Sequence, residues 1–307
     1  MNHTERPEKR SGTLLDIYHQ QKTQRRITIA AFVAIPVLLM IVFTILPLIE
    51  MFEFSFYDMR YIGRRKFVGL KNYIEVFKRK DIMASLKLSV FYIVGSVVQT
   101  SIALYLATIL SFKLRGANIF KGVMFFPFLI NGIAIGFIFK FFYTHGYVFD
   151  TILQAFGFEL DKLPFWLKNQ STNNWAIVFG SVWRYFGRAM VLYIGAIMSI
   201  DSTIYEAADI DGAGGFQRFF HIILPSIKPV VVLNLILSVK GALSAFDMPY
   251  VMTDGRNGTG TFFILMHRIA HEQQRVGLAS AMAFVLLALI LIVTLGQKLI
   301  FKYAIKD

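Results

Sequence analysis

Long stretches without a charged residue are the feature that most constrains this chain. Four are apolar and long: Ile27–Ile49 with 23 residues, Leu88–Phe112 with 25, Gly122–Phe139 with 18 and Val276–Gln297 with 22. About 20 mainly apolar residues, at ~1.5 Å rise each, cross a hydrocarbon layer about 30 Å thick. These four segments therefore predict transmembrane helices.

Two further apolar stretches have the required length but carry charges. Trp175–Ile200 contains two arginines, and Pro229–Tyr250 contains a lysine and an aspartate. The composition agrees with a membrane protein, because 56% of residues are hydrophobic and 17% charged, against about 25% charged in soluble chains. With both stretches counted, the sequence predicts an all-α, polytopic membrane protein with six transmembrane helices.

The polar segments define the predicted domain organisation. A polar leader, 1–26, precedes the six-helix domain 27–301, and 302–307 form a short tail. The first apolar block is far longer than the 7–15 residues of a signal-peptide core, so we interpret it as a retained helix. The leader carries six basic residues, which favours a cytoplasmic N-terminus in the cell membrane.

The net charge of +13 at first suggests a nucleic-acid partner. In the six-helix topology, however, 14 basic residues fall on each side of the membrane. Because the charge is divided in this way and no DNA-reading motif occurs, the sequence argues against nucleic-acid binding. The chain has no cysteine, which excludes disulfides and thiolate metal sites.

The segment 201–225 between two predicted spans is the most informative stretch. Thr203–Asp209 predicts a short helix with Ser202 or Thr203 as N-cap, glycines follow, and Phe216–Ile223 predicts a second helix that Pro225 ends. The prediction is a two-helix loop with a bend between its helices.

The spacing within this loop resembles the EAA signature of bacterial ABC importer permeases. That resemblance implies a cytoplasmic loop that docks into a cleft of a separate ATP-hydrolysing subunit. A glycine permits the bend, and the glutamate offers a carboxylate to a basic partner. The implied coupling residues are Glu206, Ala207, Ala208, Asp211, Gly212, Ile222, Leu224 and Pro225.

Further segments resemble sugar permeases of the maltose-transporter class. They include Phe67–Tyr73, Phe125–Pro127, Tyr250–Thr253 and Gly277–Ala281. The class implies a permease that imports sugars or oligosaccharides by alternating access, with both termini cytoplasmic. Its implied partners are a second permease in a heterodimer, two ATP-binding subunits that hold ATP and Mg, and an extracytoplasmic solute-binding protein. This chain itself is then expected to bind no cofactor and to catalyse no reaction.

Charged residues inside the predicted spans indicate a polar pathway. Arg184 and Arg188 share one helix face, and Lys240 lies about 16 Å into its helix. A charge at this depth costs ~2.5–3.5 kcal/mol, so such residues usually face a cavity or a partner. These cations either favour an anionic substrate, such as an acidic oligosaccharide or a sugar phosphate, or pair with acidic groups of the companion subunit, or extend their charged ends to the membrane interface.

Sugars are bound by amide and hydroxyl groups together with aromatic ring faces. Adding such residues to the charged ones gives the predicted substrate pathway. Its candidates are Gln99, Asn131, Ser181, Trp183, Arg184, Tyr185, Arg188, Asn234, Ser238, Lys240, Phe246 and Asp247.

Other functional classes find little support in the sequence. There is no Gly-x4-Gly-Lys-Ser/Thr phosphate loop, and His271-Glu272 lacks the second histidine of a zinc-protease motif, so no metal site is expected. No acid, base and nucleophile set converges to suggest an enzyme. An ion-driven secondary transporter is the alternative from another class, and it predicts inverted repeats that are not evident here.

Overall fold

The computed structural model describes residues 14–112 and 115–304, and it divides after Phe54 into two units. The first unit is a continuous helical segment of α1 (Leu14–Met40), the π-helical turn η1 (Ile41–Ile45) and α2 (Leu46–Phe54). The helix thus begins inside the predicted leader 1–26; residues 1–13 of that leader, and 305–307 of the predicted tail, lie outside the described part.

Pro47 accounts for the π-helical turn in the first unit. A proline has no N–H to donate, and its ring crowds the carbonyl four residues earlier, so the preceding turn widens. Large apolar side chains of this unit are exposed, with Phe32 at 77% and Phe43 at 73%. A helix that is apolar all round suits a lipid environment.

The count of six spans is not confirmed. Four described segments are long and apolar enough to cross a membrane: Gln21–Phe54, Lys80–Leu110, Lys228–Thr253 and Val276–Phe301. A fifth arises if one bent helix pair counts as a span. The predicted span Trp175–Ile200 forms the 26-residue helix α8 (Asn173–Met198), which is not among these candidates although it is long enough. The arginines and other polar residues of α8 lower its mean hydropathy.

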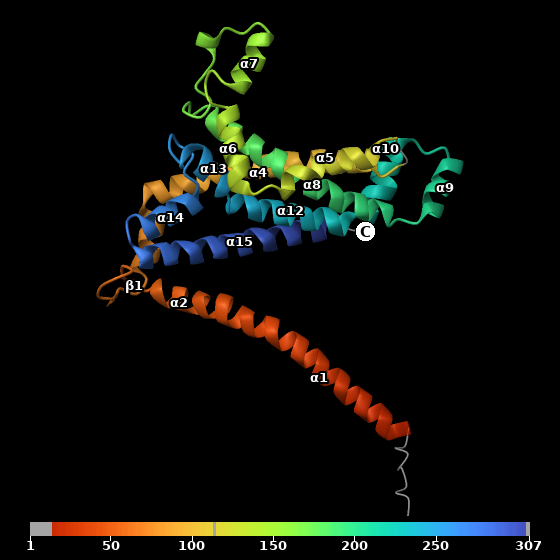
Figure 1. Cartoon of the computed structure of the whole chain (residues 1–307), viewed down its shortest axis with the longest axis horizontal. Helices are drawn as coiled ribbons and strands as arrows, with labels where there is room; N and C mark the ends of the chain where they lie inside the picture. Colours follow the sequence, from red (N-terminus) through yellow and green to blue (C-terminus); the bar gives the residue numbers. More distant parts are fainter. Residues whose placement is uncertain (1–13, 113–114, 305–307) are drawn as a thin grey trace, which may run out of the picture. The chain divides into compact units, whose positions relative to one another are not determined.

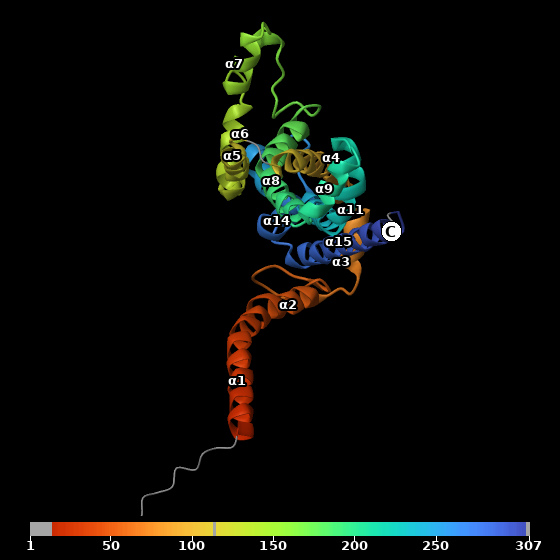
Figure 2. The same cartoon turned by 90° about the vertical axis from the view of Figure 1, so that its right-hand side faces the viewer.

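The bent pair corrects the predicted single span Gly122–Phe139. The chain forms α5 (Ala117–Leu129) and α6 (Gly132–Phe142), which meet at 99°. Ile130 is extended, and the Asn131 side chain caps α6 by accepting a 2.8 Å hydrogen bond from the N–H of Ile133. A cap satisfies an N–H that the broken helix leaves open, which stabilises the break inside an apolar stretch. Figure 2 shows α6 leading from α5 toward α7 (Val148–Ala155).

Four long helices form the body of the second unit and pack lengthwise (Figure 1). They are α4 (Lys80–Leu110), α8, α12 (Lys228–Leu243) and α15 (Val276–Ala304). Ala103 and Ala107 of α4 and Ala189 of α8 are fully buried in one apolar cluster. Small side chains let helix backbones approach closely, which is how helices commonly pack in membranes.

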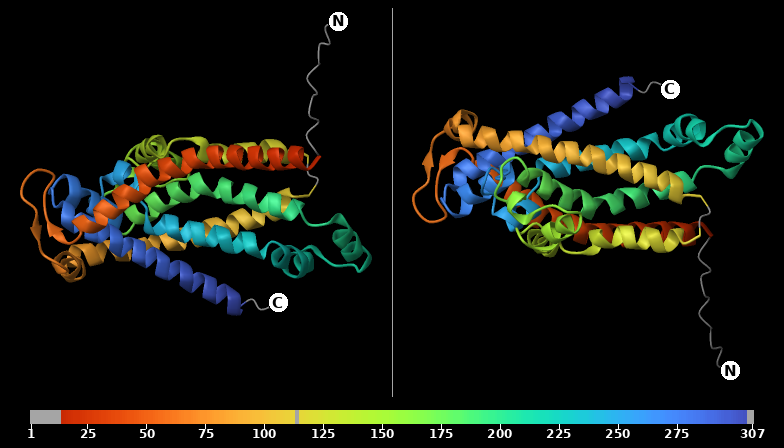
Figure 3. Two further views of the ribbon diagram at one scale, coloured as in Figure 1. Left: turned by 90° about the horizontal axis from the view of Figure 1, so that it is seen from below. Right: turned by 90° about the horizontal axis from the view of Figure 1, so that it is seen from above.

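One end of the second unit carries short elements. The strands β1 (Tyr57–Asp58) and β2 (Lys66–Phe67) pair antiparallel, so the all-α prediction needs this one exception among the described residues. The helices α3 (Lys71–Lys78), α13 (Asp247–Thr253) and α14 (Phe262–His271) lie at this end too. The opposite end carries α9 (Ser202–Ile210) and α10 (Gly215–Arg218), as Figure 3 shows.

An ion pair ties α3 to the start of α15. Both Nη atoms of Arg275 donate to the Glu75 carboxylate, at 2.5 and 2.7 Å. The hydrogen bonds from Arg275 lower the pKa of the Glu75 carboxyl. On α3, Asn72 also donates to the carbonyls of Ser55 and Tyr57, at 2.8 and 2.9 Å, and thereby fixes the chain leading into β1.

A buried carboxylate organises the segment around α7. Asp150 is fully buried and accepts hydrogen bonds of 2.6 Å from both the indole N–H of Trp166 and the backbone N–H of Gly146. The η2 turn (Leu160–Lys162) lies in the same segment. Because a buried carboxylate is costly unless its oxygens are bonded, these contacts hold the irregular chain in one conformation.

Candidate functional site

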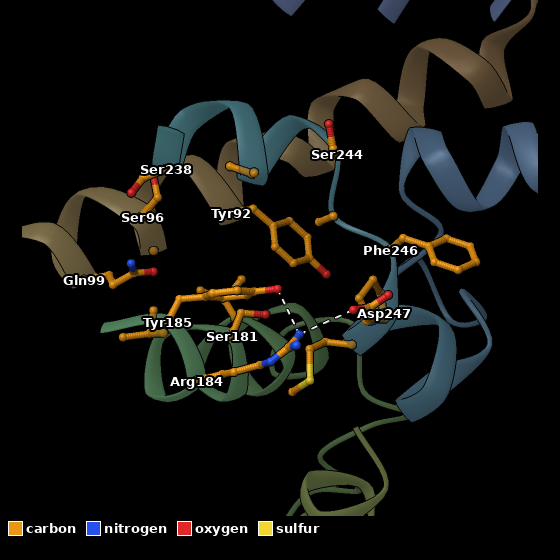
Figure 4. Close-up of a pocket in the computed structure, with 18 of the residues that line it drawn as sticks. Tyr92, Ser96, Gln99, Ser181, Arg184, Tyr185, Ser238, Ser244, Phe246 and Asp247 are labelled. Atoms are coloured by element: carbon orange, nitrogen blue, oxygen red, sulfur yellow. Dashed lines mark hydrogen bonds and ion pairs between the residues drawn. The ribbon is translucent and has the colours of Figure 1, made fainter. Parts of the chain in front are cut away.

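A polar pocket opens between α4, α8 and the α12–α13 junction (Figure 4). Its volume is about 280 Å³. Eight of the twelve predicted pathway residues line it: Gln99, Ser181, Arg184, Tyr185, Arg188, Ser238, Phe246 and Asp247. The pocket therefore gathers residues from helices far apart in the sequence, while their role in transport stays a prediction.

Arg184 forms both a hydrogen bond and an ion pair in the pocket. Its Nη1 donates to the hydroxyl of Tyr185 at 2.9 Å and lies 3.4 Å from Oδ2 of Asp247 (Figure 4). The Arg184 side chain is 12% exposed and the Asp247 side chain 46% exposed. The charge of Arg184 is therefore compensated within the chain.

Arg188 differs from Arg184, one helical turn earlier. The buried Nε atoms of both arginines lack a partner, but among residues 14–112 and 115–304 the Arg188 side chain forms no hydrogen bond or ion pair at all. The guanidinium lies 5.6 Å from the ring centre of Phe128, within cation–π range. The pocket thus carries one cation that no described carboxylate neutralises.

Hydroxyl and amide groups also line the pocket, among apolar side chains such as Val178 and Leu237. Ser96 and Gln99 come from α4, and Figure 4 shows the ring of Tyr92 on the same side, across from Tyr185 and Ser181 of α8. The Tyr92 hydroxyl is buried without a partner among the described atoms. An unsatisfied buried hydroxyl is costly, so it favours a polar ligand or water in the pocket.

Tyr92, Ser96 and Ser244 line the pocket but were absent from the predicted set. Tyr92, Ser96 and Gln99 follow one another at spacings of four and three residues, which places them on one face of α4. That spacing could have identified the first two. Ser244 follows the last residue of α12, and only the break before α13 turns it toward the pocket.

Four predicted pathway residues lie outside the pocket. Asn131 caps α6, and Trp183 is 37% exposed with its ring 5.5 Å from Phe139. Asn234 is fully buried in α12 with both side-chain atoms unpartnered among the described residues, and Lys240 is exposed in the last turn of α12. The ring of Phe246 also projects away from the pocket in Figure 4.

The segment 201–226 has the predicted two-helix form, with two corrections. Asp201, not Ser202 or Thr203, caps α9: its carboxylate accepts from the N–H of Thr203 at 3.0 Å and from the hydroxyl of Thr203 at 2.9 Å. The hydrogen bond from the Thr203 backbone lowers the pKa of Asp201. A carboxylate at this position bonds an otherwise open N–H and opposes the positive end of the helix.

The second correction concerns Pro225, which does not end the helical run. The chain continues from α10 through the π-helical turn η3 (Phe219–Ile223) into α11 (Leu224–Ser226), which contains Pro225. Pro225 follows this turn by two residues, as Pro47 follows η1. In both places a widened turn accommodates the missing N–H of the proline.

The bend between α9 and α10 is braced from both sides. Gly212 has a φ of +68°, a left-handed conformation that favours glycine. Asp209 and Arg218 form an ion pair across it, and Arg218 Nε donates to the carbonyl of Ala213 at 2.8 Å. Gln217 accepts a 2.8 Å hydrogen bond from the N–H of Gly214. The bend is therefore a defined corner.

The predicted coupling residues divide by exposure. Glu206, Ala207, Asp211, Gly212 and Pro225 are exposed, Ile222 and Leu224 are half-buried, and Ala208 is buried. Sequence reasoning missed two large apolar side chains at the corner, Ile210 at 88% and Phe216 at 79% exposure. The corner presents exposed carboxylates beside exposed apolar side chains, a combination that is typical of a docking site.

No group of three His, Asp or Glu side chains lies close enough to hold a metal in the described ranges.

Comparison with known proteins identifies the family of this chain. Residues 99–303 match the family described as binding-protein-dependent transport system inner membrane component. A probable ABC transporter permease of Bacillus subtilis, YurN, is 34% identical over 87% of this chain and 94% of its own. The trehalose/maltose transport system permease MalF of Thermococcus litoralis is 32% identical over 83% and 87%. The arabinooligosaccharides permease AraP of Bacillus subtilis is 30% identical over 91% and 89%.

The fold is shared with solved transporters. A crystal structure of a bacterial ABC transporter that imports the acidic polysaccharide alginate matches with a TM-score of 0.80 and 18% identity, over 94% of this chain and all of that one. A second structure, of a bacterial alginate transporter bound to a periplasmic protein with an alginate pentasaccharide, gives 0.77 at 17% identity, over 91% and 96%. At these identities the likeness concerns the fold.

Proposed function

Because the chain belongs to the family of binding-protein-dependent transport system inner membrane components, we propose that it forms the membrane pathway of a sugar importer driven by separate ATP-hydrolysing subunits. The chain is the permease subunit of an ABC importer. ATP and Mg then bind to the partner subunits, which carry out the hydrolysis.

The corner between α9 and α10 carries this proposal. Ile210 and Phe216 stand on either side of Gly212 with most of their surface exposed, and the exposed carboxylate of Glu206 lies on the same short helix as Ile210. On the other side, Tyr205 packs its ring 5.7 Å from Phe112, at the end of α4. Through this contact, a movement of the corner caused by the ATPase subunit would displace the end of α4. Coupling of ATP hydrolysis to the membrane helices requires such a connection.

The docking surface can be tested with charge substitutions at the corner. Ile210→Asp and Phe216→Asp each place a charge in the proposed interface, where burial without a partner costs several kcal/mol. We expect ATP-driven import to fall more than about tenfold and the ATPase subunit to co-purify poorly. For co-purification of the ATPase subunit, Ile62→Asp is the matched control, since Ile62 is 91% exposed and lies between β1 and β2, at the opposite end of the second unit. Normal ATPase binding and import by both corner variants would contradict the proposal.

The remaining partners complete the importer. A second permease would pack beside this chain as a heterodimer and close the pathway, and a solute-binding protein would deliver the sugar at the end that carries α14. Both termini are then cytoplasmic, in the cell membrane of a bacterium, with lipid around the exposed apolar side chains. Reconstitution tests this organisation: import by the lone chain on an ion gradient would instead support a secondary transporter.

The pocket supports a carbohydrate substrate. Hydroxyl, amide and tyrosine side chains line it together, a mixture that suits the hydroxyls and ring faces of sugars. The relatives transport trehalose and maltose, or arabinooligosaccharides, by name. Uptake of such sugars by proteoliposomes containing the complete transporter is the direct measurement.

Arg188 favours an acidic sugar as the second candidate substrate. Its charge is unpaired within the described chain, so a carboxylate or phosphate of the substrate can neutralise it. We expect Arg188→Gln to reduce import of a uronate oligosaccharide at least about tenfold more than import of a neutral one. Lys240→Gln, which removes a cation outside the pocket, is the control. An equal loss for acidic and neutral sugars would eliminate the acidic candidate.

A further inference from the structure

A line of aromatic and histidine rings extends from the edge of the pocket to the β1–β2 hairpin. The Phe246 and Tyr250 rings stack with centres 4.9 Å apart and planes 16° apart. His267 lies 5.7 Å from Tyr250, and His271 lies 4.6 Å from His267. Tyr61 in the hairpin stacks on His271 at 5.8 Å and 17°. We call these five side chains the ring track.

Four of the five rings lie on or next to the short helices α13 and α14. Phe246 and Tyr250 are four residues apart at the start of α13, and His267 and His271 are four residues apart on α14. Residues at this spacing share one helix face, so each helix contributes two neighbouring rings. The hydroxyl of Tyr61 hydrogen-bonds Nδ1 of His271 at 2.8 Å, which fixes the last ring in position.

We propose that the ring track binds successive sugar rings of an oligosaccharide whose end occupies the pocket. This inference rests on the proposed function. It assigns the substrate to the class of carbohydrates with several rings and gives the surface outside the pocket a part in binding them.

The size of the pocket is the first argument. At about 280 Å³ it is at the lower end of small-molecule sites, which span about 300–1,000 Å³. An oligosaccharide that enters it must leave part of its length outside. Phe246 belongs to the pocket lining, while its ring points away from the pocket in Figure 4 and stacks on Tyr250. The ring track therefore begins where the pocket ends.

The chemistry of the rings is the second argument. Aromatic faces carry negative partial charge and attract the polarised C–H groups of a sugar face, while ring nitrogens and hydroxyls can bond its hydroxyl groups. Tyr61 is 54% exposed, Tyr250 is 37% exposed, and His271 is exposed as well.

Chain-length selectivity tests the ring track. Proteoliposomes with the complete transporter are given malto-, arabino- and uronate oligosaccharides of two and of six residues, and the imported series is then compared between variants. We expect Tyr61→Ala and His271→Ala each to reduce the ratio of six-residue to two-residue import about three- to tenfold, the effect of about one ring contact. Tyr61→Phe keeps the ring and should retain the ratio, although it loses the hydrogen bond to His271.

The controls separate the possible outcomes. Phe156→Ala removes another exposed ring, 79% exposed at the end of α7, and should not change the ratio. Equal losses for both lengths, accompanied by a lower melting temperature, would show that the rings serve packing alone and would overturn the proposal. Import of none of the three series would instead contradict the proposed function.

Discussion

Arg184 on α8 and Asp247 at the start of α13 form an ion pair, with Nη1 of the guanidinium 3.4 Å from Oδ2 of the carboxylate. The two residues are 63 positions apart in the chain. Gly132, the first residue of α6, packs so closely against both side chains that a Cβ there would collide with each of them. Three helices therefore meet at this pair, beside the pocket.

Removing either partner tests the coupling between Arg184 and Asp247. Since Asp247 is 46% exposed, we expect Asp247→Asn and Arg184→Gln each to lower the free energy of unfolding by only about 1 kcal/mol. The double variant should be no less stable than the less stable of the two single variants, because each single substitution already removes the whole interaction. Thermal unfolding in detergent measures this. Asp247→Asn combined with Arg188→Gln is the control pair, and it should be additive.

Two glycines of α8 provide a matched test of helix packing. A Cβ on Gly187 would overlap the backbone of Met124 and Phe125 in α5, whereas a Cβ on Gly195 would meet nothing within 4 Å. Gly187→Ala should therefore destabilise the protein by about 1–3 kcal/mol, because a backbone cannot yield as a side chain can. Gly195→Ala should be neutral or stabilise by up to about 1 kcal/mol. Equal melting temperatures for the two variants would show that α5 does not pack on α8 as described.

The Glu75–Arg275 pair predicts a pH dependence of stability. The pKa of Glu75 lies below its ordinary value of 4.5 in the folded chain, chiefly through the hydrogen bonds from Arg275. A carboxyl with a lowered folded-state pKa contributes stability above its unfolded pKa and loses it as the pH falls through the folded value. Wild-type stability should thus fall below about pH 4.5 more steeply than that of Glu75→Gln.

The control for this pH profile is Glu159, which pairs with Lys162 while both side chains remain exposed to solvent. Glu159→Gln should leave both the stability and the acid limb of the profile unchanged. If Glu75→Gln and wild type lose stability in parallel as the solution is acidified, the pair makes no folded-state contribution.

The cap on α9 predicts a local effect. Asp201→Ala removes the acceptor for the N–H and hydroxyl of Thr203, so the first turn of α9 should open more often. We expect faster amide hydrogen exchange over residues 203–206 and weaker coupling of ATP hydrolysis to import. Asp201→Asn keeps an acceptor and should largely restore protection. Unchanged exchange in Asp201→Ala would mean that the corner is held by its other contacts alone.

Much of the helical architecture could be predicted from local sequence. Val276–Gln297 falls within α15, and Leu88–Phe112 falls within α4 except for its last two residues, because runs of apolar residues stabilise a helix in lipid wherever the rest of the chain lies. The two-helix form of 201–226 was also predictable, since glycine at 212 and a polar helix start act over a few residues. The Asn131-Gly132 pair is typical of a turn and indicated the break before α6. A prediction based only on the length of the apolar stretch passed over it.

The candidate site was less predictable. Residue type alone selected Lys240 and Asn234 as pathway candidates, yet helix rotation places the first outside the pocket and buries the second. The same reasoning missed Tyr92, whose hydroxyl is buried without a hydrogen-bond partner among the described residues. Which side of a helix faces a cavity depends on the helices around it, and those contacts are not local.

The sequence by itself determined that this chain is a helical membrane protein and that 201–225 forms two short helices with a bend, because apolar length and backbone geometry are properties of short stretches. Only the tertiary structure decided how its intramembrane charges are used. Asp247 pairs with Arg184, which leaves Arg188 without a carboxylate partner among the residues that the structure describes. Electrostatic energy depends on distance and burial, and both arise only when distant helices pack together.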